Sequence, residues 1–174
     1  MAADRAKVAR TNKKHSRDQE RRLAKYFGGN VVPLSGSGNI KGDIIIPFDD
    51  MRNIYGECKL TVKDTLNVRH EWLAKIRGEY RTMRCMFGVL VVSFIKQPVQ
   101  DFVLMSPECL SVFLRHGIKP EYQIKALADN KTFPIERNAI NQYGIMSAGL
   151  VWVLVPIATF KEWLDSIAYQ SQTE

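Results

Sequence analysis

Three side chains in the first third of the chain have the types and spacing needed for metal-assisted chemistry. Asp43 opens one apolar segment, and Glu57-Cys58-Lys59 lies within the next one. On a strand, alternate side chains share a face, so Glu57 and Lys59 point one way and Cys58 the other. A hairpin centred near Met51 would pair residues whose numbers sum to about 101, which puts Asp43 opposite position 58. The spacing therefore predicts two carboxylates and an ammonium near one end of a sheet.

These groups suit the hydrolysis of a phosphodiester. Paired carboxylates hold a hard divalent cation such as Mg²⁺ and leave positions for water and phosphate. Such an ion acidifies a bound water, and a nearby lysine can orient that water or stabilise the transition state. Glu20 lies three residues before Leu23, on the apolar stripe of the preceding helix, so it could supply a third acid.

Each of these residues also has an ordinary structural interpretation. An E-x-K pair on a strand is commonly a surface ion pair, Asp43 could be a turn residue, and Glu20 could be solvated. The order of the whole set is more informative than its members. An acid-bearing helix, a Ser/Gly loop, an aspartate before an apolar strand, a turn and an E-x-K pair follow one another. This order favours a functional site.

Positive charge is concentrated at the N-terminus. Of the net charge of +7, residues 1–25 contribute +6, from nine Lys and Arg against three acids. A basic segment of this kind suits a polyanion, most commonly DNA or RNA, although a solubilising tail would have the same composition. Lys41, Lys63 and Arg69 lie near the proposed site in the sequence and could also bind phosphate.

The apolar pattern predicts the elements that would position these groups. Ser16 and Gln19 form a capping-box pattern that starts a helix, and Gly28-Gly29 ends it. Strands are predicted over residues 30–34, 43–48 and 54–61, a helix over 67–83, and a strand buried on both faces over 85–94. The expected fold class is α/β, with a central mixed β-sheet flanked by helices. The crossover helix should make the last strand parallel to its neighbour.

The second half of the chain carries weaker patterns. A strand is expected over 101–105, a helix from Ser106-Pro107 to 116–117, a strand over 151–155 and a helix over 159–169, with 118–149 irregular. We expect a single domain over residues 16–174, preceded by a basic flexible arm over 1–15.

Composition favours a cytoplasmic protein without membrane association. No apolar run approaches the roughly 20 residues that span a bilayer, and no apolar stretch follows the basic N-terminus. The cysteines are odd in number and widely spaced, so we expect reduced thiols rather than disulfides or a zinc site. They are Cys58, Cys85 and Cys109.

Residues 17–94 resemble the PD-(D/E)xK nuclease superfamily, and within it most closely the archaeal-type Holliday junction resolvases, which also occur in phages. The resemblance is carried by Glu20-Arg21, Ser35-Gly36-Ser37-Gly38, Gly42-Asp43-Ile44-Ile45-Ile46 and Glu57-Cys58-Lys59. Gly42 stands where the family usually has proline, a residue that shapes the backbone there and binds no metal. Residues 95–174 continue past the matched core as an extension.

The resemblance implies a restriction-endonuclease-like core and Mg²⁺-dependent cleavage, with Mn²⁺ able to substitute. Asp43 and Glu57 would ligate the ion together with the Cys58 carbonyl; Lys59 would be the catalytic lysine and Glu20 an additional active-site acid. The residues expected at the DNA are Arg17, Arg21, Ser35, Ser37, Lys41 and Lys63. A homodimer would nick opposing strands of a four-way junction symmetrically, at a nucleoid or, for a viral chain, in the host cytoplasm.

Two other functions fit the same residues. A restriction-like or repair endonuclease would use the same core on other DNA structures. A noncatalytic basic module that binds nucleic acid would need Glu57 and Lys59 only as an ion pair.

Overall fold

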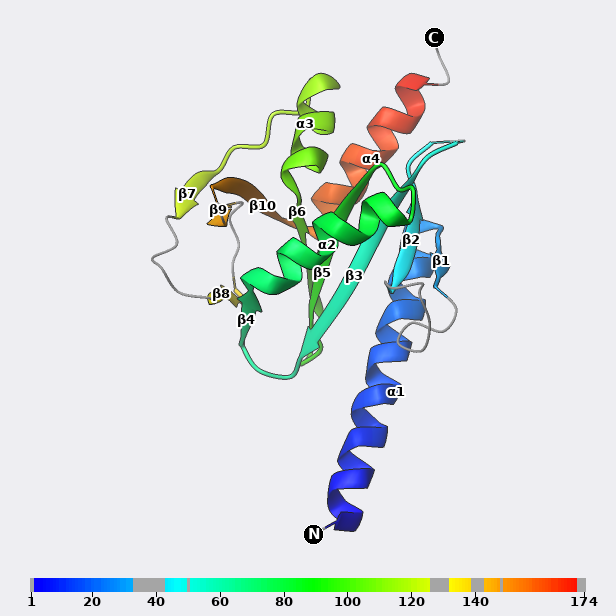
Figure 1. Ribbon diagram of the computed structural model, residues 1–174, viewed down its shortest axis with the longest axis vertical. Helices are drawn as coiled ribbons and strands as arrows, with labels where there is room; N and C mark the ends of the chain where they lie inside the picture. The colour runs from blue at the N-terminus through cyan, green and yellow to red at the C-terminus, as the bar shows by residue number, and fades with distance from the viewer. Residues whose placement is uncertain are drawn as a thin grey trace.

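Alternating apolar side chains build a mixed sheet between two helical layers (Figure 1). The computed structural model describes residues 2–32, 43–49, 51–125, 132–138, 143–147 and 149–171. Its elements in chain order are α1 (Ala2–Phe27), β1 (Asn30–Val31), β2 (Ile44–Pro47), β3 (Asn53–Thr61), β4 (Thr65–Arg69), α2 (His70–Thr82), β5 (Phe87–Phe94), β6 (Gln100–Met105), α3 (Pro107–Arg115), β7 (Gln123–Lys125), β8 (Thr132–Glu136), β9 (Tyr143–Ser147), β10 (Leu150–Pro156) and α4 (Ile157–Ser171).

The strand order in the main sheet is β1-β2-β3-β5-β6-β10-β9-β7, and β4 pairs with β8 in a separate two-stranded sheet. β2 and β3 form an antiparallel hairpin, whereas β3 and β5 are parallel because α2 carries the chain back across the sheet. The predicted α/β class and mixed sheet are confirmed, as is the parallel pairing across the crossover helix.

The two faces of the sheet bury separate apolar clusters. On β5, every residue is buried; Val89 and Val91 join the cluster beneath α1, α3 and α4, while Leu90 and Val92 join the cluster beneath α2 and the β4–β8 pair. This alternation follows the period of two along a strand. A strand buried on both faces was the structure predicted for this run.

α1 begins well before the predicted start. Its first residue is Ala2 rather than a residue near Ser16, and the Ser16 hydroxyl donates to Glu20 instead of capping a helix. The predicted end is confirmed: Gly28 has a φ of 67°, and Gly29 N donates to Ala24 O over 2.8 Å, as in a Schellman cap. Figure 1 shows the N-terminal part of α1 running past the end of the sheet.

The hairpin register differs by one residue from the prediction. Ile44 pairs with Gly56, and this places Asp43 beside Glu57 rather than opposite position 58. The turn sets the register, because Phe48 N donates to Arg52 O and the Asp49 carboxylate accepts the backbone N–H of Arg52 over 2.7 Å. The shift brings the two carboxylates closer than predicted.

The sequence patterns missed strands that depend on distant partners. The predicted helix over 67–83 begins only at His70, since Thr65–Arg69 pairs with β8. Residues 118–149, expected to be irregular, contain β7, β8 and β9. The predicted Ser106 cap is confirmed, with Cys109 N donating to its hydroxyl over 3.2 Å.

The described cysteines are free thiols, with Cys58 and Cys109 buried and Cys85 partly buried. Across the described ranges, no helix has the length and apolar character needed to cross a membrane.

Candidate active site

The site forms where β2 begins and β3 continues past it. Backbone hydrogen bonds hold Asp43 between two neighbours: its N–H donates to Gly56 O, and its carbonyl accepts from Val32 N. The Asp43 side chain reaches across the hairpin, and Oδ2 accepts the Cys58 N–H over 2.6 Å. The hairpin therefore fixes the aspartate against the strand that carries Glu57.

Glu57 is 5% exposed and is held by cations on two elements. Lys59 Nζ on the same strand donates to its Oε1 over 2.7 Å, and Lys75 Nζ on α2 donates over 3.1 Å. The Tyr55 hydroxyl donates its one hydrogen to Glu79, and its oxygen lies 3.2 Å from Oε2 of Glu57. Burial of Glu57 is compatible with its charge because these groups satisfy it.

Lys59 reaches the surface of the site. Its side chain is 29% exposed and its Nζ lies 5.3 Å from the centre of the Trp72 ring, which packs along one side of it. The neighbouring Cys58 points into the opposite face of the sheet, beneath α1, as the strand alternation requires. On the face that carries the Glu57 and Lys59 side chains, Cys58 thus presents only its backbone.

α1 adds Glu20 from a helix that is anchored beside Lys59. Gln19 Nε2 donates to Lys59 O over 3.1 Å and to the buried Ser93 Oγ over 2.7 Å. Arg22 makes a two-pronged ion pair with Asp101, at 2.6 and 2.7 Å. These contacts place Glu20, which is 6% exposed, on the side of α1 that faces the sheet.

The charges of these groups act on one another. Burial and the negative charge of Glu57 together raise the pKa of Asp43 to about 6. Burial also raises the pKa of Glu20, although the Ser16 hydrogen bond and the charge of Arg17 oppose this. For Glu57, burial acts in the same direction, but Lys59 and Lys75 outweigh it and lower its pKa. We call Glu20, Asp43, Glu57, Lys59 and Lys75 the acid–lysine cluster.

The donors available to a metal ion are oxygens. Asp43 and Glu57 contribute carboxylates, and the Cys58 carbonyl lies on the strand between Glu57 and Lys59. Among the described residues, no group of three or more His, Cys, Asp or Glu side chains forms a complete metal cage. Two carboxylates with one carbonyl still fit Mg²⁺, which keeps several of its waters in proteins. The high pKa of Asp43 marks a site where an added cation would be favourable.

The structure brings together the four predicted catalytic residues, Glu20, Asp43, Glu57 and Lys59. The predicted DNA contacts Arg17 and Arg21 are exposed on α1, and Lys63 is exposed just after β3. Ser35, Ser37 and Lys41, as well as Gly42, lie outside the described residues.

Sequence reasoning missed the polar residues on β3 and α2 that surround Glu57, of which Glu79 is linked to it only through Tyr55 and Lys75. They are Tyr55, Lys75 and Glu79. Tyr55 shares a face of β3 with Glu57 and Lys59, so the strand alternation could have indicated it. Lys75 and Glu79 are four apart on one helix, which is a common spacing for a surface ion pair. Nothing in that spacing indicates a third partner on β3.

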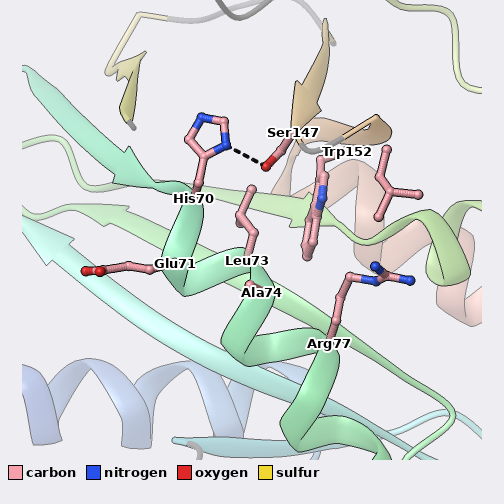
Figure 2. A pocket seen from close by; sticks show the side chains of 8 residues that line it. His70, Glu71, Leu73, Ala74, Arg77, Ser147 and Trp152 are labelled. Atoms are coloured by element: carbon pink, nitrogen blue, oxygen red, sulfur yellow. Dashed lines mark hydrogen bonds between the residues drawn. The ribbon is translucent and has the colours of Figure 1, made fainter. Parts of the chain in front are cut away.

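A separate pocket lies on the other flank of α2 (Figure 2). It has a volume of about 260 Å³, and Leu73, Trp152 and Arg77 contribute to its wall. Within it, His70 Nδ1 lies 2.8 Å from Ser147 Oγ, a pairing found in hydrolases that use serine as a nucleophile. His70 Nε2 is buried and hydrogen bonds to none of the described residues, so no acid orients the imidazole. The acid–lysine cluster is the better candidate site.

No model of a protein family matches this chain, and no curated protein sequence matches it either.

Proposed function

We propose that this chain is a Mg²⁺-dependent DNA endonuclease with a restriction-endonuclease-like core, and that it cuts branched DNA such as four-way junctions. One observation supports this above the others. Asp43 and Glu57 lie side by side at the start of a hairpin, with Lys59 on the same strand and Glu20 entering from α1. This is the set of groups that phosphodiester hydrolysis requires.

The residues would divide the work between binding and charge stabilisation. Asp43, Glu57 and the Cys58 carbonyl would hold the ion on the edge of the hairpin. Mg²⁺, when bound, supplies an acidified water and offsets the charge on the phosphate. Lys59 would release Glu57 and turn its ammonium towards the attacking water or the phosphate, while Lys75 keeps Glu57 in place. Glu20 would orient water from the α1 side.

The order of elements supports the proposed core. An N-terminal helix is followed by an antiparallel hairpin, a crossover helix and a strand parallel to the second hairpin strand. The acids of the site come from the helix and the hairpin, as the resemblance of residues 17–94 implies. The homodimer and the preference for four-way junctions depend on that resemblance alone.

The noncatalytic alternative has one observation in its favour. The Lys59–Glu57 pair at 2.7 Å is what a purely structural ion pair would give. However, an ion pair needs one acid, and this site holds two further acids beside it, Glu20, which is buried, and Asp43, which is partly buried. Burying several acids together lowers stability, and acids perturbed in this way cluster at functional sites. The burial of these acids therefore favours a catalytic site.

The proposal is tested by incubating the purified protein with labelled four-way junction, duplex of matched sequence and single strand, each with Mg²⁺ or with chelator. We expect Mg²⁺-dependent paired nicks in the junction. Equal cutting of plain duplex would support the nuclease chemistry but contradict the preference for junctions, and would favour a restriction-like or repair endonuclease. Failure to cut any of these DNAs, with salt-sensitive binding intact, would contradict the nuclease and favour the noncatalytic module.

A further inference from the structure

The outward face of α1 carries a regular row of cations. Lys14, Arg17, Arg21 and Lys25 are all exposed and follow one another at spacings of three or four residues. At about 100° per residue, these positions fall on one face of the helix. The same spacing continues in the sequence to Arg10 and Lys7. We call the four exposed residues the basic stripe.

Among the described residues, the cations of the basic stripe have no ion-pair partners. Arg22 is paired with Asp101, but none of the four stripe residues forms an ion pair with an acid in the part of the chain that the structure describes. The face of α1 that packs on the sheet is a different one, formed by Leu23, Ala24 and Phe27. The positive charge on the outward face is therefore available to a partner.

The stripe passes beside the acid–lysine cluster. Arg17 lies three residues before Glu20, on the adjoining face of the helix, and its charge lowers the pKa of Glu20. Lys14 lies one turn to one side of Arg17, and Arg21 and Lys25 lie one and two turns to the other. α1 has 26 residues, or about 39 Å at 1.5 Å per residue, and it runs past the end of the sheet (Figure 1). A polyanion held along the stripe would thus lie on the outer side of the helix whose sheet-facing side carries Glu20.

The composition of α1 identifies the partner as nucleic acid rather than lipid or a second helix. The apolar residues of its C-terminal half are buried against the sheet. Between Ala2 and Ser16 the sequence has a single large apolar residue, Val8. A helix that lies in a membrane surface or pairs in a coiled coil needs an apolar face, and α1 has none to spare. The outward face of α1 therefore presents positive charge without an apolar surface, which suits contacts to phosphates.

We propose that the basic stripe binds the phosphates of a duplex DNA arm along the outer side of α1, the helix that supplies Glu20 to the acid–lysine cluster. A straight row of cations suits the regular backbone of a duplex, and Lys and Arg without base-reading partners give binding that is independent of sequence. From Lys14 to Lys25 the stripe is about 17 Å long at 1.5 Å per residue, or about five base pairs at 3.4 Å each, so a duplex of about 12 base pairs covers it. The inference rests on the proposed function for its choice of DNA, but binding to the stripe needs neither metal nor cleavage.

The test measures binding in the presence of chelator, by the fluorescence anisotropy of a labelled duplex of about 12 base pairs between roughly 50 and 200 mM salt. Arg21→Gln/Lys25→Gln removes two stripe cations. Arg115→Gln/Lys119→Gln removes two exposed cations at and after the end of α3 and is the matched control for net charge. Circular dichroism and melting of both variants report on folding.

We expect the stripe variant to bind roughly tenfold or more weakly and to lower the slope of log K against log salt by about 1.8, since each lost phosphate contact removes about 0.9. The control should keep the slope of the unmodified protein. Equal effects in both variants, or no change of slope in either, would overturn the inference. So would tighter, stripe-dependent binding to duplex RNA or to phosphatidylserine vesicles. This binding test is independent of cleavage, which the test of the proposed function measures. If that test finds no cleavage and this one finds stripe-dependent binding, the nuclease proposal is refuted and this inference stands.

Discussion

Asp43 and Glu57 lie next to each other on the hairpin, yet their pKa values move in opposite directions. Burial and the charge of Glu57 raise the pKa of Asp43 to about 6, whereas Lys59 and Lys75 lower that of Glu57 despite its burial. Glu57 is thus fully charged near neutral pH, whereas Asp43 titrates close to neutral pH. Pairs of acids with separated pKa values are typical of catalytic sites.

The raised pKa of Asp43 predicts a pH-dependent cost to stability. The folded protein keeps the Asp43 proton to a higher pH than the unfolded chain does, so its free energy of unfolding falls as pH rises from about 4 to about 6. A shift from 3.8 to about 6 corresponds to about 3 kcal/mol. We expect Asp43→Asn, measured by urea denaturation with chelator, to be about 1–3 kcal/mol more stable than the unmodified protein near pH 7.5 and equally stable near pH 4.

Asp49→Asn is the control for this prediction, because the pKa of Asp49 is lowered. Its slight burial acts the other way, but Arg52 and the backbone N–H groups of the turn outweigh it. Its stabilising effect is present at neutral pH and is lost as pH falls through the lowered pKa, so Asp49→Asn should be less stable than the unmodified protein near neutral pH. If Asp43→Asn also has a lower free energy of unfolding than the unmodified protein near neutral pH, the charged form of Asp43 does not destabilise the fold, and the prediction is wrong.

At this scale, the sequence predicted the catalytic candidates and missed their supports. Asp43, Glu57 and Lys59 are near each other along two consecutive strands, so the period of two was enough to bring them together. Lys75 comes from a crossover helix, and its contact with Glu57 depends on how that helix is rotated on the sheet. A single sequence does not specify that rotation.

At the scale of elements, the position of Glu20 depends on how tightly α1 is held against the sheet. Gln19 is 4% exposed and bonds to both β3 and β5. We expect Gln19→Ala to reduce the free energy of unfolding by about 1–3 kcal/mol, because Lys59 O and Ser93 Oγ lose a buried donor. It should also slow cleavage by loosening the helix that carries Glu20.

Asp18→Ala provides the comparison for Gln19→Ala, since Asp18 is the adjacent residue of α1 and is exposed. Its effect on stability should be within about 0.5 kcal/mol. Chemical denaturation measures both variants. Equal stabilities for the two would mean that Gln19 does not anchor the helix.

The junction between α1 and β2 depends on a close approach at Gly29. A Cβ there would lie 2.0 Å from the backbone oxygen of Ile45, so α1 would have to move. At Gly28 a Cβ would meet no atom within 4 Å, and only the φ of 67° opposes it. Gly28→Ala should cost about 1–2 kcal/mol, and Gly29→Ala should cost clearly more in thermal or urea unfolding. A smaller loss for Gly29→Ala than for Gly28→Ala would contradict the packing of α1 on β2.

Elements whose apolar pattern is local were predicted well, and elements that depend on distant partners were not. β5 was predicted from its uninterrupted apolar run, and α3 from Ser106-Pro107. β4 resembles the start of a helix until β8 pairs with it, and β8 lies more than sixty residues further along the chain. The start of α1 was missed because its first turns have no apolar stripe to mark a helix.

At the scale of the whole molecule, the proposed function would use two features that lie on the same helix. The sheet-facing side of α1 delivers Glu20 to the hairpin, and its outward side carries the basic stripe. Most of the net charge of +7 comes from residues 1–25, so the positive charge is concentrated on the helix that also carries Glu20. The concentration of charge was evident from the sequence, and the polyanion partner stays a prediction. Residues 1–15 were predicted to be a flexible arm, whereas α1 begins at Ala2.

The most direct test of the nuclease is the single-turnover rate of cleavage of a labelled four-way junction with Mg²⁺ by Asp43→Asn, Asp49→Asn and the unmodified protein. Both variants exchange a carboxylate for an amide on the same hairpin, but only Asp43 lies in the acid–lysine cluster. We predict a loss of roughly a hundredfold or more for Asp43→Asn, with junction binding kept or tightened, and a rate close to that of the unmodified protein for Asp49→Asn. Cleavage by Asp43→Asn at the unmodified rate would contradict the assignment of this site.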